Sequence, residues 1–239
     1  MLEVNSSKIA LFADVVDEKA IERFATWPQI QGFTTNPSLL KKAGVSDYKN
    51  FAIKALRAAD GKCVSFEVIS DSEQDIEREA KTISGWGENV FVKIPFLKTD
   101  GTDNTRVIKR IAENGVKLNI TAVFGVDQVK KIAECIDNTR ASVIISIFAG
   151  RIADTGIDPR PIVVESKEIV KNLQDIKLLW ASSREIFNVI DAQSCGCDII
   201  TLTSDLLEKF KLWGKDLNEY SRQTAEQFYK DAKAAQLMI

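Results

Sequence analysis

The sequence predicts a (β/α)8 barrel that is followed by an additional C-terminal helix. Short apolar segments alternate with helical segments eight times between about residue 8 and residue 212. The apolar segments are rich in β-branched residues and mostly apolar throughout, which is typical of parallel strands that are covered on both faces. No glycine- and serine-rich linker divides the chain, so residues 1–239 are expected to form one barrel domain, with 213–239 as a helical extension.

The predicted elements alternate in order along the chain. Asp17 is suited to cap the first helix, and Ser72 and Asp75 have the spacing of a capping box for the third. The strands are expected at 8–13, 32–35, 63–68, 90–94, 116–123, 142–148, 177–181 and 198–202. The helices are expected at 18–25, 48–59, 72–83, 104–113, 127–136, 162–173, 184–192, 206–212 and 217–235. A doubly wound open sheet is the alternative, although no glycine-rich dinucleotide fingerprint follows the first strand.

The composition argues against several functional classes. A net charge of -2 with interspersed acids and bases gives no basic surface for nucleic acid. No apolar run approaches the ~20 residues of a membrane span, and residues 1–5 lack the layout of a signal peptide. The four cysteines lack the spacing of redox or zinc pairs and are expected to be reduced thiols. We therefore expect a cytoplasmic protein that binds neither nucleic acid nor membrane.

The chain contains no histidine. This removes the usual general base of neutral pH, the histidine-based catalytic triads and most catalytic zinc or iron sites. Any chemistry must rest on Lys, Asp, Glu, Ser, Thr, Asn, Arg or Tyr, and no metal site is expected.

One lysine lies inside an apolar strand. Because side chains alternate along a strand, Lys93 and Phe91 point to one face while Val92 points to the other. A lysine at the carboxyl end of such a strand is either a rim residue in water or a desolvated amine. A desolvated amine loses its proton more easily and becomes a nucleophile for carbonyl groups.

Polar residues stand at the ends of seven consecutive predicted strands. They are Asp14, Asn36, Glu67, Lys93, Asn119 with Thr121, Ser146 with Arg151, and Ser182 with Arg184. The alternative is that these side chains simply meet solvent. Asn119 and Thr121 argue against it, because they share one face of an otherwise apolar strand. In a (β/α)8 barrel these positions meet at one mouth, where active sites are built.

The chemistry that fits these groups is imine formation. A neutral lysine attacks a ketone, and the protonated imine then withdraws electrons as a carbon–carbon bond breaks. Asp14 and Glu67 can move the protons, and amides and hydroxyls can hold a polyol. The arginines Arg151 and Arg184, in neighbouring loops, suit a phosphate.

These residues occur in motifs that resemble those of the transaldolase family. The resemblance runs from residue 10 to about residue 207. It rests on FAD at 12–14, TTNPS at 34–38, FEV at 66–68, VKIP at 92–95, NIT at 119–121, SIFAGR at 146–151 and ASSR at 181–184. TTNPS together with VKIP is the specific pair, whereas any one of the others alone would be weak.

The resemblance implies a Schiff-base enzyme without metal or organic cofactor, which moves a dihydroxyacetone unit between sugar phosphates. It implies that Lys93 forms the imine and that Asp14 takes the proton of the C4 hydroxyl. Glu67 would shuttle protons through a water held by Thr121. The implied substrate-binding residues are Asn36, Asn119 and Ser146 for the hydroxyls, Phe148 as a wall, and Arg151, Ser182 and Arg184 for the phosphate.

Three functional alternatives remain. The closest is a fructose-6-phosphate aldolase that releases free dihydroxyacetone. That branch resembles this chain in length but tends to have Gln, Tyr and Lys at the positions of Glu67, Phe124 and Arg184, so the resemblance favours a transaldolase. The others are a Schiff-base enzyme acting on a modified sugar, and a barrel that binds sugar phosphates without catalysis.

The C-terminal helical extension carries four aromatic residues, Trp213, Tyr220, Phe228 and Tyr229. It could pack onto its own barrel. In short relatives, however, this helix reaches a neighbouring subunit, so the resemblance implies a homo-oligomer such as a pentamer or decamer. A monomer mass in light scattering would contradict that expectation.

Overall fold

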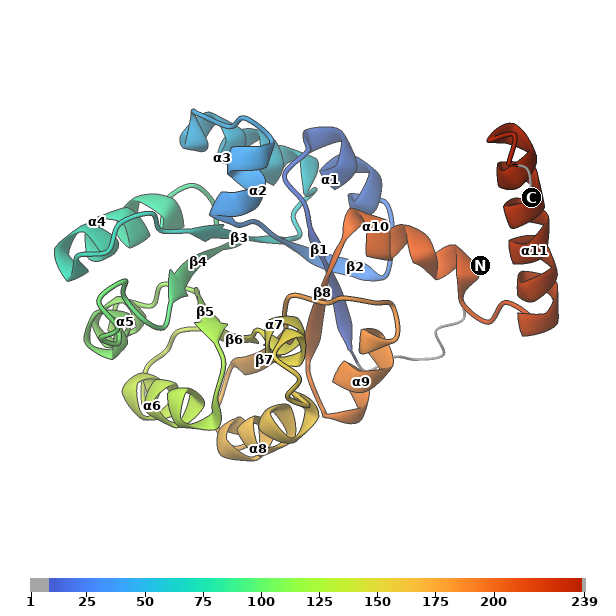
Figure 1. Cartoon of the computed structure of the whole chain (residues 1–239). Helices are drawn as coiled ribbons and strands as arrows, with labels where there is room; N and C mark the ends of the chain where they lie inside the picture. The colour runs from blue at the N-terminus through green and yellow to red at the C-terminus, as the bar shows by residue number, and fades with distance from the viewer. Residues whose placement is uncertain (1–8, 238–239) are drawn as a thin grey trace.

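The computed structural model describes residues 9–237 and confirms the predicted (β/α)8 barrel. Each strand pairs in parallel with the next, and β8 closes the ring against β1 (Figure 1). All the strand carboxyl ends therefore lie at one mouth of the barrel. The strands are β1 Ala10–Asp14, β2 Ile30–Thr34, β3 Cys63–Glu67, β4 Val90–Pro95, β5 Leu118–Val123, β6 Val143–Ile147, β7 Ile176–Trp180 and β8 Ile199–Thr203.

The helices surround the barrel, except for α11, which stands away from it (Figure 1). They are α1 Glu18–Ala25, α2 Pro37–Lys42, α3 Tyr48–Ala58, α4 Glu73–Ser84, α5 Thr105–Glu113, α6 Val126–Ile136, α7 Ala149–Asp154, α8 Arg160–Val170, α9 Asn188–Ser194, α10 Ser204–Glu208 and α11 Leu217–Ala234. The 3-10 helix η1, Lys209–Leu212, continues α10, so the helix predicted at 206–212 is two short elements. The additional C-terminal helix is confirmed as α11.

α2 and α7, which have six residues each, were not predicted from the sequence. Asn36 caps α2: its Oδ1 accepts from the Leu39 N–H at 2.9 Å, and Pro37 occupies the first turn. α7 starts at Ala149, directly after the strand that was predicted at 142–148. Such short helices carry too few residues for a recognisable apolar period.

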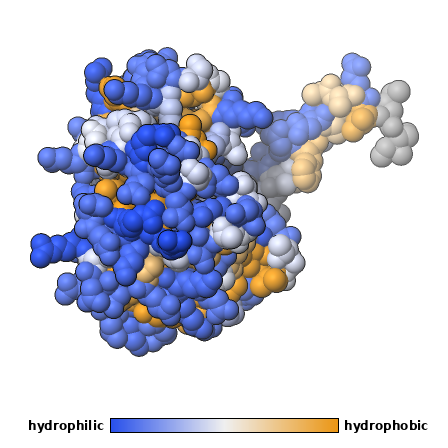
Figure 2. All heavy atoms as spheres, turned by 90° about the vertical axis from the view of Figure 1, so that its left-hand side faces the viewer, coloured by the Kyte–Doolittle hydropathy of each residue, from blue (hydrophilic) through white to orange (hydrophobic). Residues whose placement is uncertain are grey.

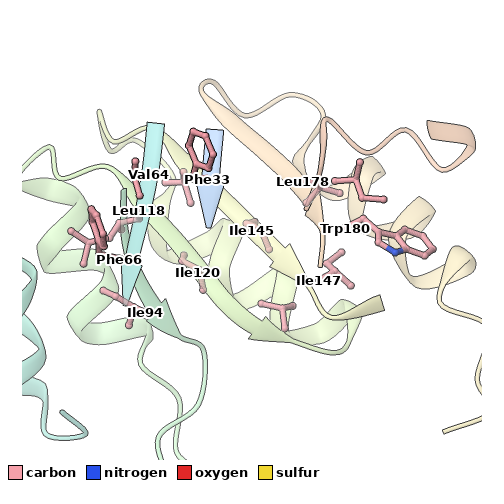
Figure 3. Close-up of a cluster of buried hydrophobic side chains, with 14 of the residues drawn as sticks. Phe33, Val64, Phe66, Ile94, Leu118, Ile120, Ile145, Ile147, Leu178 and Trp180 are labelled. Carbon is pink, nitrogen blue, oxygen red and sulfur yellow. The ribbon is translucent and has the colours of Figure 1, made fainter. Parts of the chain in front are cut away.

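Buried side chains form two shells, as the alternation of strand residues requires. The outer shell lies between strands and helices and includes Phe33, Ile120 and Trp180, part of which Figure 3 shows. The inner shell fills the barrel interior and includes Phe12, Ile144, Leu179 and Ile199, with Phe91 packed against it. Val92 belongs to the outer shell, so the predicted alternation around Lys93 is confirmed.

α11 stands away from the barrel (Figures 1 and 2). None of its residues is buried in the single chain, and Leu217, Phe228 and Tyr229 are 79%, 68% and 65% exposed. The helix therefore does not pack onto its own barrel. Homo-oligomer formation stays a prediction.

Between residues 9 and 237, no helix combines the length and apolar character needed to cross a membrane. The four cysteines are free thiols, as expected. The cytoplasmic location stays a prediction.

Candidate active site

A cavity of about 330 Å³ lies at the carboxyl-terminal mouth of the barrel. Most of the predicted site residues line it, and each comes from the carboxyl end of a strand or from the segment that follows that strand. Those in the lining are Asp14, Asn36, Glu67, Lys93, Thr121, Ser146, Phe148, Arg151 and Ser182. Asn119 and Arg184 are absent from the lining and contact it only through other residues.

The centre of the cavity is a buried amine beside a carboxylate. Lys93 on β4 is 6% exposed, and its Nζ lies 3.1 Å from Glu67 Oε2. The Nζ also donates to the Thr35 carbonyl oxygen at 3.0 Å. The register of β3 and β4 pairs Glu67 with Lys93 directly, so the strand ladder itself brings the two groups together. A buried ammonium needs such partners, because an unpaired charge in the interior is costly.

Asp14 is held by a chain of hydroxyl groups on neighbouring strands. Thr34 Oγ1 donates to Asp14 Oδ1 at 2.8 Å and lies 2.7 Å from Thr201 Oγ1. Asn36 Nδ2 donates to Asp14 Oδ2 at 3.3 Å. Burial raises the pKa of the Asp14 carboxyl above its ordinary value, although Lys93 and these hydrogen bonds act in the opposite direction. A raised pKa suits a carboxyl group that must both accept and return a proton near neutral pH.

Asn119 lies beneath the cavity floor. It is fully buried, donates from Nδ2 to Ser65 Oγ at 3.0 Å and accepts from Ser146 Oγ at 2.7 Å. It therefore orients Ser146, which lines the cavity. Thr121 is 1% exposed, and its Oγ1 has no hydrogen-bond partner among residues 9–237. A buried hydroxyl without a partner costs about 1–3 kcal/mol, so this one suits a substrate or water oxygen.

The backbone is bent where two strands enter the site. Ala122 has φ 55°, and the β5–β6 register shifts between Ile120 and Val123, which is the mark of a β-bulge. Ser182 has φ 65° at the end of β7. A left-handed non-glycine residue costs of order 1–3 kcal/mol, and such residues cluster at functional sites.

The two predicted phosphate arginines occupy different places. Arg151 lines the cavity, with its guanidinium carbon 5.3 Å above the centre of the Phe148 ring. Arg184 pairs with Asp154, Nε lying 2.9 Å from Oδ1, and its Nη1 donates to Ser182 Oγ at 3.0 Å. The Arg184 hydrogen bonds lower the pKa of Asp154. Arg184 thus contacts the cavity lining through Ser182.

A close backbone contact fixes this arginine arrangement. α7 packs against the loop after β7, and a Cβ atom built on Gly150 would lie 1.6 Å from the Ser182 carbonyl oxygen. Only glycine permits this approach. The contact holds Arg151 on α7 and Ser182 after β7 at one side of the cavity.

Sequence reasoning missed Thr34 and Thr201, which line the cavity and support Asp14. The two-residue alternation of side chains along a strand could have identified both residues. Thr34 lies two residues before Asn36 on the same face, and Thr201 sits between apolar residues on the eighth strand, where no polar candidate had been assigned.

The chain is similar to known proteins along most of its length. Residues 11–239 match the model of the family described as Transaldolase/Fructose-6-phosphate aldolase. A protein of Caldicellulosiruptor saccharolyticus named "Probable transaldolase" is 31% identical over 201 residues, which are 83% of this chain and 88% of that protein. A protein of Nitrosopumilus maritimus with the same name is 30% identical over 203 residues, 83% and 86% of the two chains.

The fold is also shared with a solved structure of low identity. Dihydrodipicolinate synthase from Rhodopseudomonas palustris superposes with a TM-score of 0.57 at 12% identity, covering 94% of this chain and 79% of its own. At that identity the likeness concerns the barrel fold alone.

The raised pKa of Asp14 predicts a gain in stability for Asp14→Asn. When a carboxyl has a higher pKa in the folded state than in the unfolded state, the folded protein loses stability as the pH rises. For Asp14 this loss begins near the ordinary pKa of 3.8 and is complete above the folded-state pKa. The substitution should therefore raise the Tm at pH 7, and the gain should shrink as the pH falls toward about 4. Thermal unfolding followed by circular dichroism checks this.

Asp100→Asn is a control of opposite sign. Hydrogen bonds from Thr102 lower the pKa of Asp100, so its carboxylate stabilises the fold at neutral pH. This substitution should lower the Tm at pH 7. A lower Tm for Asp14→Asn at the same pH would contradict the buried-carboxyl interpretation.

Proposed function

We propose that this protein, which belongs to the transaldolase/fructose-6-phosphate aldolase family, transfers a dihydroxyacetone unit from a ketose phosphate to an aldose phosphate through an imine on Lys93. The observation that carries the proposal is the buried Lys93 amine, 3.1 Å from the Glu67 carboxylate in a cavity lined by hydroxyl groups. Such an amine has a partner that can take its proton, and a shielded site in which to attack a carbonyl group.

The first half-reaction forms the imine and cleaves the sugar. Glu67 accepts a proton from the Lys93 ammonium, and the neutral amine attacks the C2 ketone of the donor. Glu67 returns a proton as water leaves, assisted by the Thr121 hydroxyl. Asp14 then takes the proton of the C4 hydroxyl, the C3–C4 bond breaks, and its electron pair moves into the protonated imine. The aldose phosphate leaves, and a three-carbon enamine stays bound to Lys93.

The second half-reaction reverses these steps on a new aldehyde. The enamine carbon attacks the acceptor carbonyl, Asp14 returns its proton to the new hydroxyl, and water hydrolyses the imine. The Asp14 proton is thus kept in the site between the two halves, which agrees with the raised pKa of its carboxyl. The hydroxyl chain from Thr201 through Thr34 holds the carboxyl in place meanwhile.

The two ends of the cavity suit the two ends of a sugar phosphate. Asn36 and Ser146 offer an amide and a hydroxyl near Lys93 for the dihydroxyacetone oxygens, and Asn119 acts through Ser146. Arg151 and Ser182 offer the phosphate site. Because Arg184 Nη1 donates to Ser182 Oγ, the Ser182 hydroxyl hydrogen is left to donate to a phosphate oxygen.

Transfer rather than release is favoured by the residues at two positions. Glu67 supplies a carboxylate where the resemblance associates Gln with aldolases. Phe124, whose ring centre lies 5.7 Å from that of Phe148, supplies no phenol where aldolases tend to have Tyr. The enamine then waits for an acceptor instead of being protonated.

The proposal predicts that triose phosphate is released from fructose 6-phosphate only when erythrose 4-phosphate is present as acceptor. A coupled assay of triose phosphate with and without the acceptor measures this. Equal release without the acceptor would identify the aldolase reaction instead. No release in either condition would indicate a different donor sugar.

Arg151 and Arg184 should differ in their effect on substrate binding. Removing one charge-assisted contact costs about 1.5–3 kcal/mol, so Arg151→Ala should raise KM for the ketose phosphate roughly 10- to 100-fold. Arg184→Ala should have a smaller effect, because this guanidinium pairs with Asp154 and touches the cavity only through Ser182. Steady-state kinetics of both variants test the assignment, and an equal or larger rise in KM for Arg184→Ala would overturn it.

A further inference from the structure

Tyr48, on the first turn of α3, contacts the backbone of Glu67 twice. Its hydroxyl accepts from the Glu67 N–H at 2.8 Å and donates to the Glu67 carbonyl oxygen at 3.0 Å. One side chain therefore pairs with both polar groups of the peptide backbone at the residue that faces Lys93.

The hydroxyl occupies the place of a missing strand partner. In a parallel sheet, alternate residues pair with opposite neighbouring strands. Val68 N–H donates to the Lys93 carbonyl on β4, whereas the Ser65 carbonyl accepts from Thr35 on the β2 side. Glu67 must then direct its N–H and C=O toward β2, but β2 ends at Thr34 and the chain turns into α2. The Tyr48 hydroxyl pairs with both groups where β2 no longer can.

The Tyr48 ring is held firmly enough to serve as such a support. It contacts Phe66 and Trp86 edge-to-face, with ring centres 6.2 and 5.4 Å apart, and stacks on Phe51 at 6.5 Å. Burial also raises the pKa of the Tyr48 phenol, so the hydroxyl keeps the hydrogen that it donates to Glu67. The aromatic contacts thus fix the Tyr48 side chain of α3 against the end of β3.

We propose that Tyr48 is a positioning residue, whose hydroxyl holds the end of β3 so that the Glu67 carboxylate stays aligned with the Lys93 amine. Tyr48 does not line the cavity and touches no reacting atom. Its contribution to the reaction rests on the proposed function of the Lys93–Glu67 pair. Its effect on the distance between the Glu67 carboxylate and the Lys93 amine does not depend on that function.

The test is Tyr48→Phe, which removes the hydroxyl and keeps the ring. A carboxylate displaced by less than an ångström loses much of its efficiency in proton transfer, so kcat should fall roughly 10- to 100-fold. KM for the ketose phosphate should stay within about twofold, because Arg151 and Ser182 lie in other loops. Tyr229→Phe is the matched control: it removes a phenol hydroxyl on α11, outside the aromatic cluster, and should leave kcat unchanged.

A double-mutant cycle separates positioning from general stability. If Tyr48 acts through Glu67, then Tyr48→Phe should lower kcat by less than about twofold in a Glu67→Gln background. An equal fall in both backgrounds, or no fall in the wild-type background, would overturn the proposal. These outcomes require that the wild-type protein turns over, so an inactive wild type would reject the proposed function rather than the role of Tyr48.

Crystal structures of the wild type and Tyr48→Phe give a reading that needs no turnover. The wild-type separation of Glu67 Oε2 and Lys93 Nζ is 3.1 Å. The proposal predicts a longer or more variable separation in the variant, with the aromatic cluster unchanged. An unchanged separation would reject the positioning role whatever the activity of the protein.

Discussion

The pairing of Lys93 with Glu67 is the interaction on which the rest of the site depends. Neither group would be tolerated alone at this depth, because an isolated buried charge costs several kcal/mol. The β3–β4 register places them opposite each other, and the end of β3 fixes the height at which they meet. A shift of one residue in either strand would turn one of them into the outer shell.

The closed barrel makes this pairing possible and shields it. The inner shell of Phe12, Phe91 and Ile144 fills the barrel beneath the site, and the cavity lies at the carboxyl-terminal mouth above it. Above that shell, side-chain hydrogen bonds run from strand to strand across the barrel rather than along one strand. Asn119 joins Ser65 to Ser146, and Thr34 joins Asp14 to Thr201. Each of these side chains is therefore held by a hydrogen bond from a different strand.

The barrel could be predicted from the sequence because strand and helix periods alternate cleanly over the whole chain. The set of residues at the mouth followed from one rule, that parallel strands present their carboxyl ends together. α2 and α7 escaped because six residues do not establish a helical period. The directions of long side chains could not be predicted either. Both Arg151 and Arg184 were expected to bind the phosphate, but Arg184 forms an ion pair with Asp154 and does not line the cavity. Tyr48 could not be predicted, because its hydroxyl contacts a backbone group that only the end of β2 leaves unpaired.

Reductive trapping can show whether Lys93 is the nucleophile. The protein would be incubated with fructose 6-phosphate and sodium borohydride, digested, and examined by mass spectrometry, alongside Lys93→Ala and the control Lys98→Ala. If Lys93 forms the imine, a reduced sugar adduct is expected on the peptide that contains Lys93, and it should be lost in Lys93→Ala and persist in Lys98→Ala. An adduct on another lysine, or undiminished trapping in Lys93→Ala, would contradict this role of Lys93.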